Sequence, residues 1–228
     1  MALQQIQQVF IDLKLHDIVI VKPEQLNNEL YLHIKQNLKR KIEKKCIDAG
    51  YICRINDIVD YKDGYLLPED FSGSVRFKVA YNAKICVVVP NTQTICKIEN
   101  IFKAIIKAVN GPIIVLIKFT DINTNLFKIN ETGNIINTKT NKPLKQDDHI
   151  KITIKSKRSY IGDNTIGVIG YIEDIATPEQ IKEHMFKEFE DDLDEIKPYV
   201  KKNIVMNEDN DVAEEQTVAT ENQYIMDI

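Results

Sequence analysis

The sequence has no tryptophan, only 8 glycines and 7 prolines among 228 residues, and no long apolar run. A membrane-spanning helix needs roughly 18 or more consecutive apolar residues, and no stretch approaches that length. The first ten residues carry glutamines where a secretion signal would have a basic and then an apolar segment. These absences favour an intracellular protein that has no membrane partner.

Motifs of common catalytic sites are also missing. There is no GxxxxGK[ST] loop, no HExxH motif and no nucleophile elbow, and the four histidines are scattered. The cysteines lack the CxxC spacing that supplies paired zinc ligands. They are Cys46, Cys53, Cys86 and Cys96. We therefore expect a non-enzyme without catalytic residues, metal or cofactor, whose thiols are buried and reduced.

Charge is divided unevenly along the chain, although the formal net charge is only −4. Residues 1–172 hold 25 Lys and Arg against 17 Asp and Glu, and residues 173–228 hold 5 against 17. A basic body with an acidic tail suggests that the body contacts a polyanion. A solvated surface with a solubilising tail has the same composition, so charge alone leaves both interpretations open.

The first 89 residues are predicted to form a small α+β unit. Alternating and β-branched apolar residues predict strands over 10–22, 51–59 and 74–89, with a turn-forming segment between the last two. A helix is predicted between the first two strands, because apolar residues recur every four positions from Leu26 through Cys46. Gly50 is expected to be its C′ residue. Lysines crowd the C-terminal half of this helix, either as compensation of the helix dipole or as a face for an acidic partner.

Residues 90–175 contain repeated short apolar runs. The stretches 95–102 and 103–109 fit a helical stripe, but their β-branched residues and the closing Asn110-Gly111 favour two strands. Further strands are predicted over 113–119, 151–157 and 165–172, with a polar loop over 123–145. About five short strands, a hairpin and a long loop suggest a small Greek-key barrel of the OB type.

The acidic region 176–228 is expected to hold one helix and a tail. Thr177 is a suitable cap, Pro178 suits the first helical position, and apolar residues recur every four positions up to Leu193. This pattern predicts an amphipathic helix over 178–196, which either meets a partner or folds back on its own barrel. Residues 203–228 have no periodicity and are expected to be disordered.

Several segments resemble, in order and spacing, the large stalk subunit of multisubunit RNA polymerases. This family comprises the seventh subunit of eukaryotic polymerase II, its archaeal counterpart and the equivalents in large DNA viruses. The resemblance lies in His16-Asp17-Ile18, Lys45-Cys46 with Gly50-Tyr51-Ile52, the run from Gly73 to Ala83, Asp147 to Ile152, and Ile166 to Tyr171. The chain departs from the family after Cys86, where the Gly-Glu pair is missing. The first barrel hairpin also lacks the Gly-aromatic step that often supplies a stacking surface. Phe102 and Phe119 are expected in the core rather than as stacking platforms.

The resemblance implies a non-catalytic stalk subunit with three parts: a tip domain over 1–89, an S1/OB-type barrel over 90–175, and an acidic helix and tail over 176–228. Its partners would be the polymerase core subunits, nascent RNA and a small stalk subunit of the fourth-subunit type. The resemblance implies core docking by the tip loop 60–72, and by the first strand with its following turn. The docking residues expected are Asp60, Tyr61, Lys62, Asp63, Gly64, Tyr65, Leu66 and Leu67. The RNA-binding residues expected on the barrel are Lys103, Lys107, Lys118, Lys151, Lys155, Lys157 and Arg158.

A second functional class remains open, namely a freestanding S1/OB RNA-binding factor of the translation-initiation type. The two differ in the 50–83 region, which must bury against a large partner only in a stalk subunit. Richness in Ile, Lys and Asn hints at an AT-rich genome such as that of a large DNA virus. The expected location is accordingly the nucleus, or the host cytoplasm or virion for a viral protein.

Overall fold

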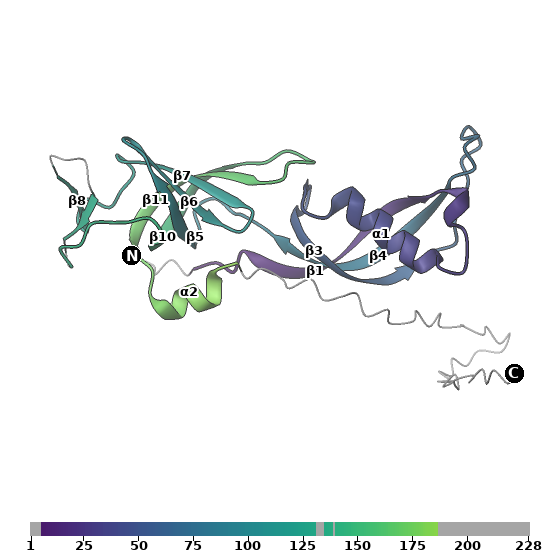
Figure 1. Ribbon diagram of the computed structural model, residues 1–228, viewed down its shortest axis with the longest axis horizontal. Coiled ribbons are helices and arrows are strands. Elements are labelled where there is room, and N and C mark those ends of the chain that lie inside the picture. The colour runs from purple at the N-terminus through teal and green to yellow at the C-terminus, as the bar shows by residue number, and fades with distance from the viewer. Residues whose placement is uncertain (1–5, 131–134, 139, 187–228) are drawn as a thin grey trace, which may run out of the picture. The chain divides into compact units, whose positions relative to one another are not determined.

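A computed structural model describes residues 6–130, 135–138 and 140–186 of the chain. These residues form a mixed α+β structure that consists mostly of strands, with a four-stranded sheet, a closed five-stranded barrel and two α-helices (Figure 1). Neither helix is long and apolar enough to cross a membrane.

The four-stranded sheet is built from the first 86 residues and has the order β1-β4-β3-β2. Its elements are β1 (Phe10–Val21), η1 (Pro23–Gln25), α1 (Leu30–Ile42), β2 (Cys46–Ile47), β3 (Gly50–Tyr61) and β4 (Val75–Cys86). Neighbouring strands are antiparallel throughout. This N-terminal sheet agrees with the predicted arrangement of one helix on an antiparallel sheet.

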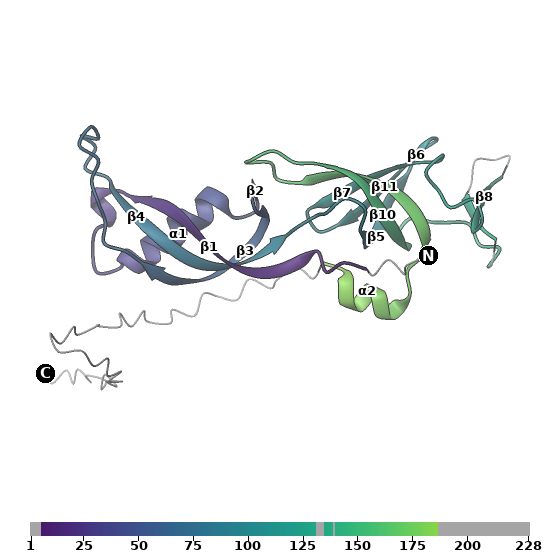
Figure 2. The ribbon, with the colours of Figure 1, turned by 180° about the vertical axis from the view of Figure 1, so that it is seen from behind.

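Helix α1 covers one face of the N-terminal sheet. Its buried residues Ile34, Leu38 and Ile42 share a hydrophobic core with inward residues of β1, β3 and β4. Alternation on β1 places Val19 and Val21 in this core while Ile18 and Ile20 stay exposed. Figure 2, seen from behind, shows the strands in front of the helix, so the opposite face of the sheet is left open by α1.

The barrel comprises β5 (Gln93–Ile101), β6 (Ile105–Asn110), β7 (Ile113–Lys118), β10 (His149–Arg158) and β11 (Ile166–Ile175). Around the barrel the order is β5-β6-β7-β11-β10, with β10 returning to β5. Only the β7–β11 pair is parallel. Numbered within the barrel this is 1-2-3-5-4, which is consistent with an OB-type barrel. The two strands predicted over 95–109 are confirmed, as is the hairpin after Asn110.

The polar loop predicted over 123–145 contains two short strands. They are β8 (Phe127–Ile129) and β9 (Ile135–Asn137), which pair as a small antiparallel hairpin. Phe127 and Ile135 reach into the barrel core, so the hairpin is fastened to the barrel.

The barrel core continues into the near end of the N-terminal sheet. Tyr51, Cys53 and Cys86 of the sheet belong to the same buried cluster as the barrel isoleucines. Backbone hydrogen bonds add to this junction: the Cys46 amide donates to the Asp163 carbonyl at 2.7 Å, and the Gly162 amide donates to the Cys46 carbonyl at 2.8 Å. The turn between β10 and β11 therefore holds the edge strand β2.

Two helix boundaries differ from prediction. Helix α1 ends at Ile42, and the left-handed residue after it is Lys44 (φ 59°) rather than Gly50. Asp48 and Ala49 form the turn between β2 and β3, so Cys46 lies in a strand. The second helix, α2 (Pro178–His184), begins with the predicted Thr177 cap but ends at His184, because the backbone of Met185 is extended. Positions 187–196 of the predicted helix, and the tail over 203–228, lie outside the described residues.

Candidate nucleic-acid interface

Strands β6, β7 and β11 present a continuous outer face on the barrel. Cross-strand partners lie on the same side of a sheet, so pairing places Lys107 beside Leu116, and Leu116 beside Ile169. Two residues further along, Ile105 pairs with Lys118. We call this surface the β6–β7–β11 face; its members are Ile105, Lys107, Leu116, Lys118, Ile169 and Tyr171.

Apolar and cationic side chains alternate on the β6–β7–β11 face. Leu116 and Ile169 are 47% and 46% exposed, although both lie within barrel strands. Lys107 makes an ion pair with Glu99 of β5 at 2.7 Å. Both side chains of this ion pair are half-buried.

Cations on β10 extend this surface at its edge. The Lys155 ammonium lies 5.3 Å from the ring centre of Tyr171 and 2.7 Å from a carboxylate oxygen of Asp121. The Arg158 guanidinium lies 5.2 Å from the ring centre of Tyr160. Arg158 pairs with Gly167 of β11, on the same outer side as Ile169.

The structure brings five of the seven predicted RNA-binding residues to this surface and its margins. Lys107 and Lys118 lie on the face, Lys103 lies in the turn between β5 and β6, and Lys155 and Arg158 border it on β10. The other two lie apart from it. Lys151 is opposite Ile95 of β5 and Asp174 of β11, and Lys157 pairs with Val168, whose side chain points into the barrel.

Aromatic residues on this surface were missed by the sequence reasoning. Tyr160 is 61% exposed in the β10–β11 turn, and Tyr171 lies on the face beneath Lys155. The period of two along β11 could have identified Tyr171, because Ile172 beside it points inward. The expectation for Phe119 holds, since it packs against the barrel core. For Phe102 it is wrong: this side chain is 56% exposed in the β5–β6 turn.

The predicted docking residues lie at the end of β3 and in the loop that follows. Asp60 and Tyr61 close β3, and the Tyr61 ring meets Phe77 edge-on at 6.1 Å. Tyr65 exchanges two backbone hydrogen bonds with Arg76, which carries the β3–β4 pairing into the loop. Gly64 lies against Val75 and Phe77, where a Cβ would come within 2.3 Å of a Val75 methyl. Tyr61, Gly64 and Tyr65 therefore shape the loop.

Exposed apolar side chains gather near this loop. Leu66 is 60% exposed and Phe71 is 97% exposed, while Leu67 is half-buried. The remaining predicted docking residues, Lys62 and Asp63, are exposed. The loop meets the turn after β1, because a Cβ on Gly73 would lie 3.2 Å from the Pro23 ring. The loop and the end of the first strand are thus neighbours, as the docking hypothesis requires.

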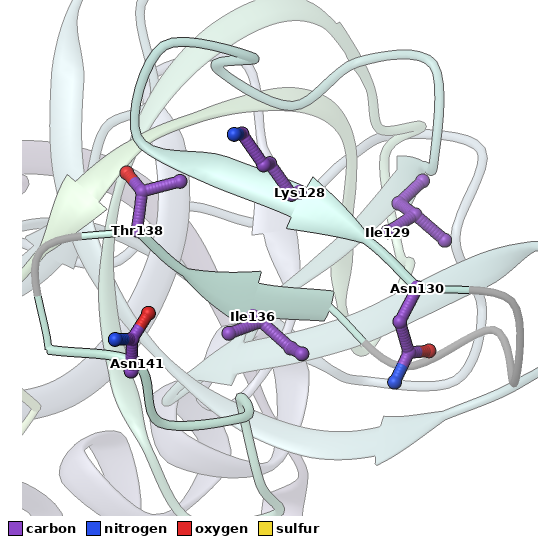
Figure 3. Close-up of a pocket in the computed structure, with 6 residues that line it drawn as sticks. All are labelled: Lys128, Ile129, Asn130, Ile136, Thr138 and Asn141. Carbon is purple, nitrogen blue, oxygen red and sulfur yellow. The ribbon is translucent and has the colours of Figure 1, made fainter.

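A shallow pocket lies on the β8–β9 hairpin (Figure 3). Its lining residues are Lys128, Ile129, Asn130, Ile136, Thr138 and Asn141. The lining offers one cation and no carboxylate, thiol or imidazole. Segments 131–134 and 139, which adjoin it, are outside the described residues, and we assign this pocket no function.

The four cysteines lie buried as free thiols. Burial raises the pKa of the Cys53 thiol to about 12, and it raises the pKa of the Cys86 and Cys96 thiols as well. Thiols held neutral in this way are poor nucleophiles and poor metal ligands. Among the described residues, no group of three or more His, Cys, Asp or Glu side chains could hold a metal ion.

A comparison with known proteins relates the chain to a viral protein. No family model matches the sequence. The chain is 31% identical over 178 residues to a protein of Acanthamoeba polyphaga mimivirus named "Putative DNA-directed RNA polymerase subunit", and the match covers 78% of this chain and 89% of the viral protein. Identity at this level over most of both chains establishes common family membership. The chain therefore belongs to the family of DNA-directed RNA polymerase subunits that this viral protein represents.

Proposed function

We propose that this chain is the large stalk subunit of a viral multisubunit RNA polymerase and has no catalytic role of its own. The observation that carries the proposal is the pairing of an OB-type barrel with an N-terminal sheet and helix, in a chain whose relative is named as a polymerase subunit. Stalk subunits of the resembled family combine a tip domain over the first 89 residues with a barrel over 90–175, and the proposal carries this division to the chain.

RNA contact is attributed to the β6–β7–β11 face and its margins. An OB-type barrel binds oligonucleotides on its second and third strands, which here are β6 and β7. Lys103, Lys107 and Lys118 can attract phosphates, and Tyr171 and Tyr160 offer rings for base stacking. Such a surface grips RNA in a salt-dependent manner with little regard to sequence.

Core docking is attributed to the far end of the N-terminal sheet. Exposed apolar groups of this size at one end of a sheet are typical of protein–protein contacts. Leu66 and Phe71 supply them in the 60–72 loop, and Ile20 (50% exposed) supplies another on β1. Ile20 pairs with Arg76, which in turn bonds Tyr65, so the strand and the loop form one surface.

A small stalk subunit is the second protein partner that we propose, and the sheet face opposite α1 offers it a surface. For a viral polymerase the location would be the host cytoplasm or the virion, and the comparison gives no support for the nucleus. Nascent RNA completes the set of partners.

Affinity purification of the tagged chain from infected cells tests the docking. The wild-type protein should recover large polymerase subunits through a high-salt wash, and the double variant Leu66→Ser/Phe71→Ser should lose them. Ile161→Ser is the matched control, since Ile161 is 74% exposed but lies in the β10–β11 turn. Equal recovery by all three proteins would contradict docking through this loop.

Binding of a 20-nucleotide oligouridine tests the RNA contact. The double variant Lys103→Glu/Lys118→Glu should weaken binding about ten-fold at low salt and reduce the salt dependence, because each lost phosphate contact lowers the slope by about 0.7. Lys182→Glu, on the exposed surface of α2, is the control. RNA binding without any recovery of polymerase subunits would instead favour the freestanding RNA-binding factor.

A further inference from the structure

The turn between β10 and β11 joins the candidate RNA surface to the C-terminal end of α1. It carries Tyr160, whose ring lies 5.2 Å from the Arg158 guanidinium at the margin of the β6–β7–β11 face. Further along the turn, the Gly162 amide donates to the Cys46 carbonyl at 2.8 Å, and the Cys46 amide donates to the Asp163 carbonyl at 2.7 Å. Cys46 follows the last residue of α1 by only four positions. The end of the helix is therefore fixed beside the exposed aromatic residue of the turn.

Cations gather at this end of α1. Positions 35–45 hold six Lys and Arg against one Glu. The Lys45 ammonium donates to the carbonyls of Arg40 and Lys41, at 3.4 and 3.2 Å, and so satisfies the end of the helix. The Lys41 ammonium pairs with the Asp17 carboxylate at 2.8 Å. Compensation of the helix dipole and pairing with β1 thus account for Lys45 and Lys41, and they do not account for Arg40 and Lys44.

Arg40 and Lys44 are exposed, and neither forms an ion pair with the residues that the structure describes. Lys44 has a φ of 59°, in the left-handed region that glycine and asparagine adopt more readily. Its amide donates to the Ile52 carbonyl at 2.9 Å, which holds the backbone in this conformation. A lysine held where glycine would cost less indicates a use for the charged side chain.

A single strand of RNA can pass from the barrel to these cations. In OB-type barrels the loop between the fourth and fifth strands borders the nucleic-acid site, and here that loop is the β10–β11 turn. Arg158 lies within about 13 Å of Gly162 along the chain, and Lys44 lies within about 7 Å of Cys46. With roughly 5 Å between the bonded strands, the path is about 25 Å or less. About seven stacked nucleotides, at roughly 3.4 Å each, would cover it.

We propose that RNA bound on the β6–β7–β11 face continues over the β10–β11 turn onto the end of α1, where Arg40 and Lys44 bind its phosphates. This inference rests on the proposed RNA contact of the barrel and extends it to the N-terminal sheet. Lysine and arginine bind phosphates without regard to base sequence, so the added contacts increase affinity and salt dependence. Since an OB-type barrel alone holds about 4 to 16 nucleotides, a short RNA is held by the barrel and a longer one reaches both parts.

Binding of oligouridines of 8 and 20 nucleotides to the full-length chain tests this path. Arg40→Glu/Lys44→Glu should weaken binding of the 20-nucleotide probe about ten-fold at low salt. It should also lower the salt slope by about 1.4, because two phosphate contacts are lost at about 0.7 each. Affinity for the 8-nucleotide probe should change by less than about two-fold, which also shows that the variant is folded. The exchange Arg40→Lys/Lys44→Arg keeps both charges and should bind both probes as the wild type does.

Lys14→Glu/Lys78→Glu is the matched control, since both lysines are exposed and lie on the sheet face opposite α1. It changes the net charge equally and should reduce affinity for the 20-nucleotide probe by less than about two-fold. Equal losses in the two variants would overturn the proposal, because general charge repulsion explains them. Unchanged affinity of the α1 variant, with loss in Lys103→Glu/Lys118→Glu, would overturn the path and leave the barrel contact supported. Failure of the wild-type protein to bind either probe would reject the barrel contact and the path together.

Discussion

At the residue scale, Gly50 is a position where any side chain would strain the backbone and crowd a neighbouring strand. Its φ of +142° is rarely adopted by other residues, and a Cβ there would approach the Cys86 carbonyl oxygen to 2.6 Å. The neighbour is backbone of β4, which cannot move aside without breaking its pairing. We expect Gly50→Ala to lower the free energy of unfolding by about 3 kcal/mol in urea denaturation. Gly162→Ala is the matched control: φ is +90° but nothing lies within 4 Å, so the loss should be about 1 kcal/mol. Equal losses would show that crowding against β4 contributes nothing.

Also at the residue scale, the buried thiols make stability sensitive to alkaline pH. The folded pKa of Cys53, about 12, lies above the ordinary value of 9.0, because burial penalises the thiolate. The unfolded chain therefore releases this proton first, so the contribution is intact below pH 9 and is lost as pH rises from 9 towards 12. The expected slope is about 1.4 kcal/mol per pH unit for each such thiol. Urea denaturation of wild type and Cys53→Ala between pH 8 and 11 should give a shallower decline for the variant. A wild-type stability that stays constant to pH 11 would contradict this account.

At the element scale, the β10–β11 turn serves as a connector to the N-terminal sheet. The Asp163 carboxylate accepts a hydrogen bond from the Tyr160 amide at 2.7 Å and so shapes the turn whose backbone bonds Cys46. We expect Asp163→Ala to cost about 1 kcal/mol and to speed hydrogen exchange of the Cys46 amide. Asp70→Ala removes a similar bond to the Ser72 amide in the 60–72 loop, far from β2 in the sheet. That control should leave Cys46 exchange unchanged, and equal acceleration in both variants would argue against a local connector.

Strands with one buried face could be predicted from the sequence. Successive side chains of a strand point to opposite faces, so apolar residues alternate with polar ones wherever a single face is buried. The alternation around Val75 and Ile152 located β4 and β10, and the Asn-Gly pair located the β6–β7 hairpin. Element ends were harder. Cys46 continues the four-residue period of α1, yet the backbone turns at Lys44 and the same side chain is buried from a strand instead. The spacing of apolar residues indicates which side chains are buried. It does not show whether the last of them lies in the helix or in the strand that follows.

The candidate interface was predictable only in part, because the sequence pattern indicates which way a side chain points and does not show which strands are neighbours. Lysines that alternate with apolar residues along a strand are expected to point outward, and this pattern places Lys155 on the outside of β10. Which cations share one face depends on strand order, and the parallel β7–β11 pair joins segments about 50 residues apart. The carboxylate that pairs with Lys155 is Asp121, which lies 34 residues away along the chain. The register shift between Ile154 and Ser156 changes the alternation along β10 and pairs Lys157 with Val168, which the sequence pattern does not reveal.

At the scale of the whole molecule, the barrel and the N-terminal sheet share one core. Val9, Tyr51 and Cys86, all from the first 89 residues, are buried in the same cluster as the barrel residues Cys96 and Ile113. A second cluster lies under α1 and includes Ile52 and Ile85, which neighbour Tyr51 and Cys86 on their strands. Adjacent residues of β3 and β4 contribute to both clusters. Unfolding of one cluster therefore removes the strands that support the other.

This continuity predicts that the described part of the chain unfolds as one cooperative unit. Calorimetry of residues 6–186 should give a single transition whose calorimetric and van't Hoff enthalpies agree. A fragment of residues 90–186 lacks Val9, Tyr51 and Cys86, so its barrel would expose the apolar surface that they cover. Removal of even one large buried side chain costs about 2–5 kcal/mol, so this fragment should be unfolded or far less stable than the longer protein. Two resolved transitions, or a fragment that melts at the temperature of the longer protein, would contradict the shared core. They would mean instead that a boundary near residue 89 separates two independently stable domains.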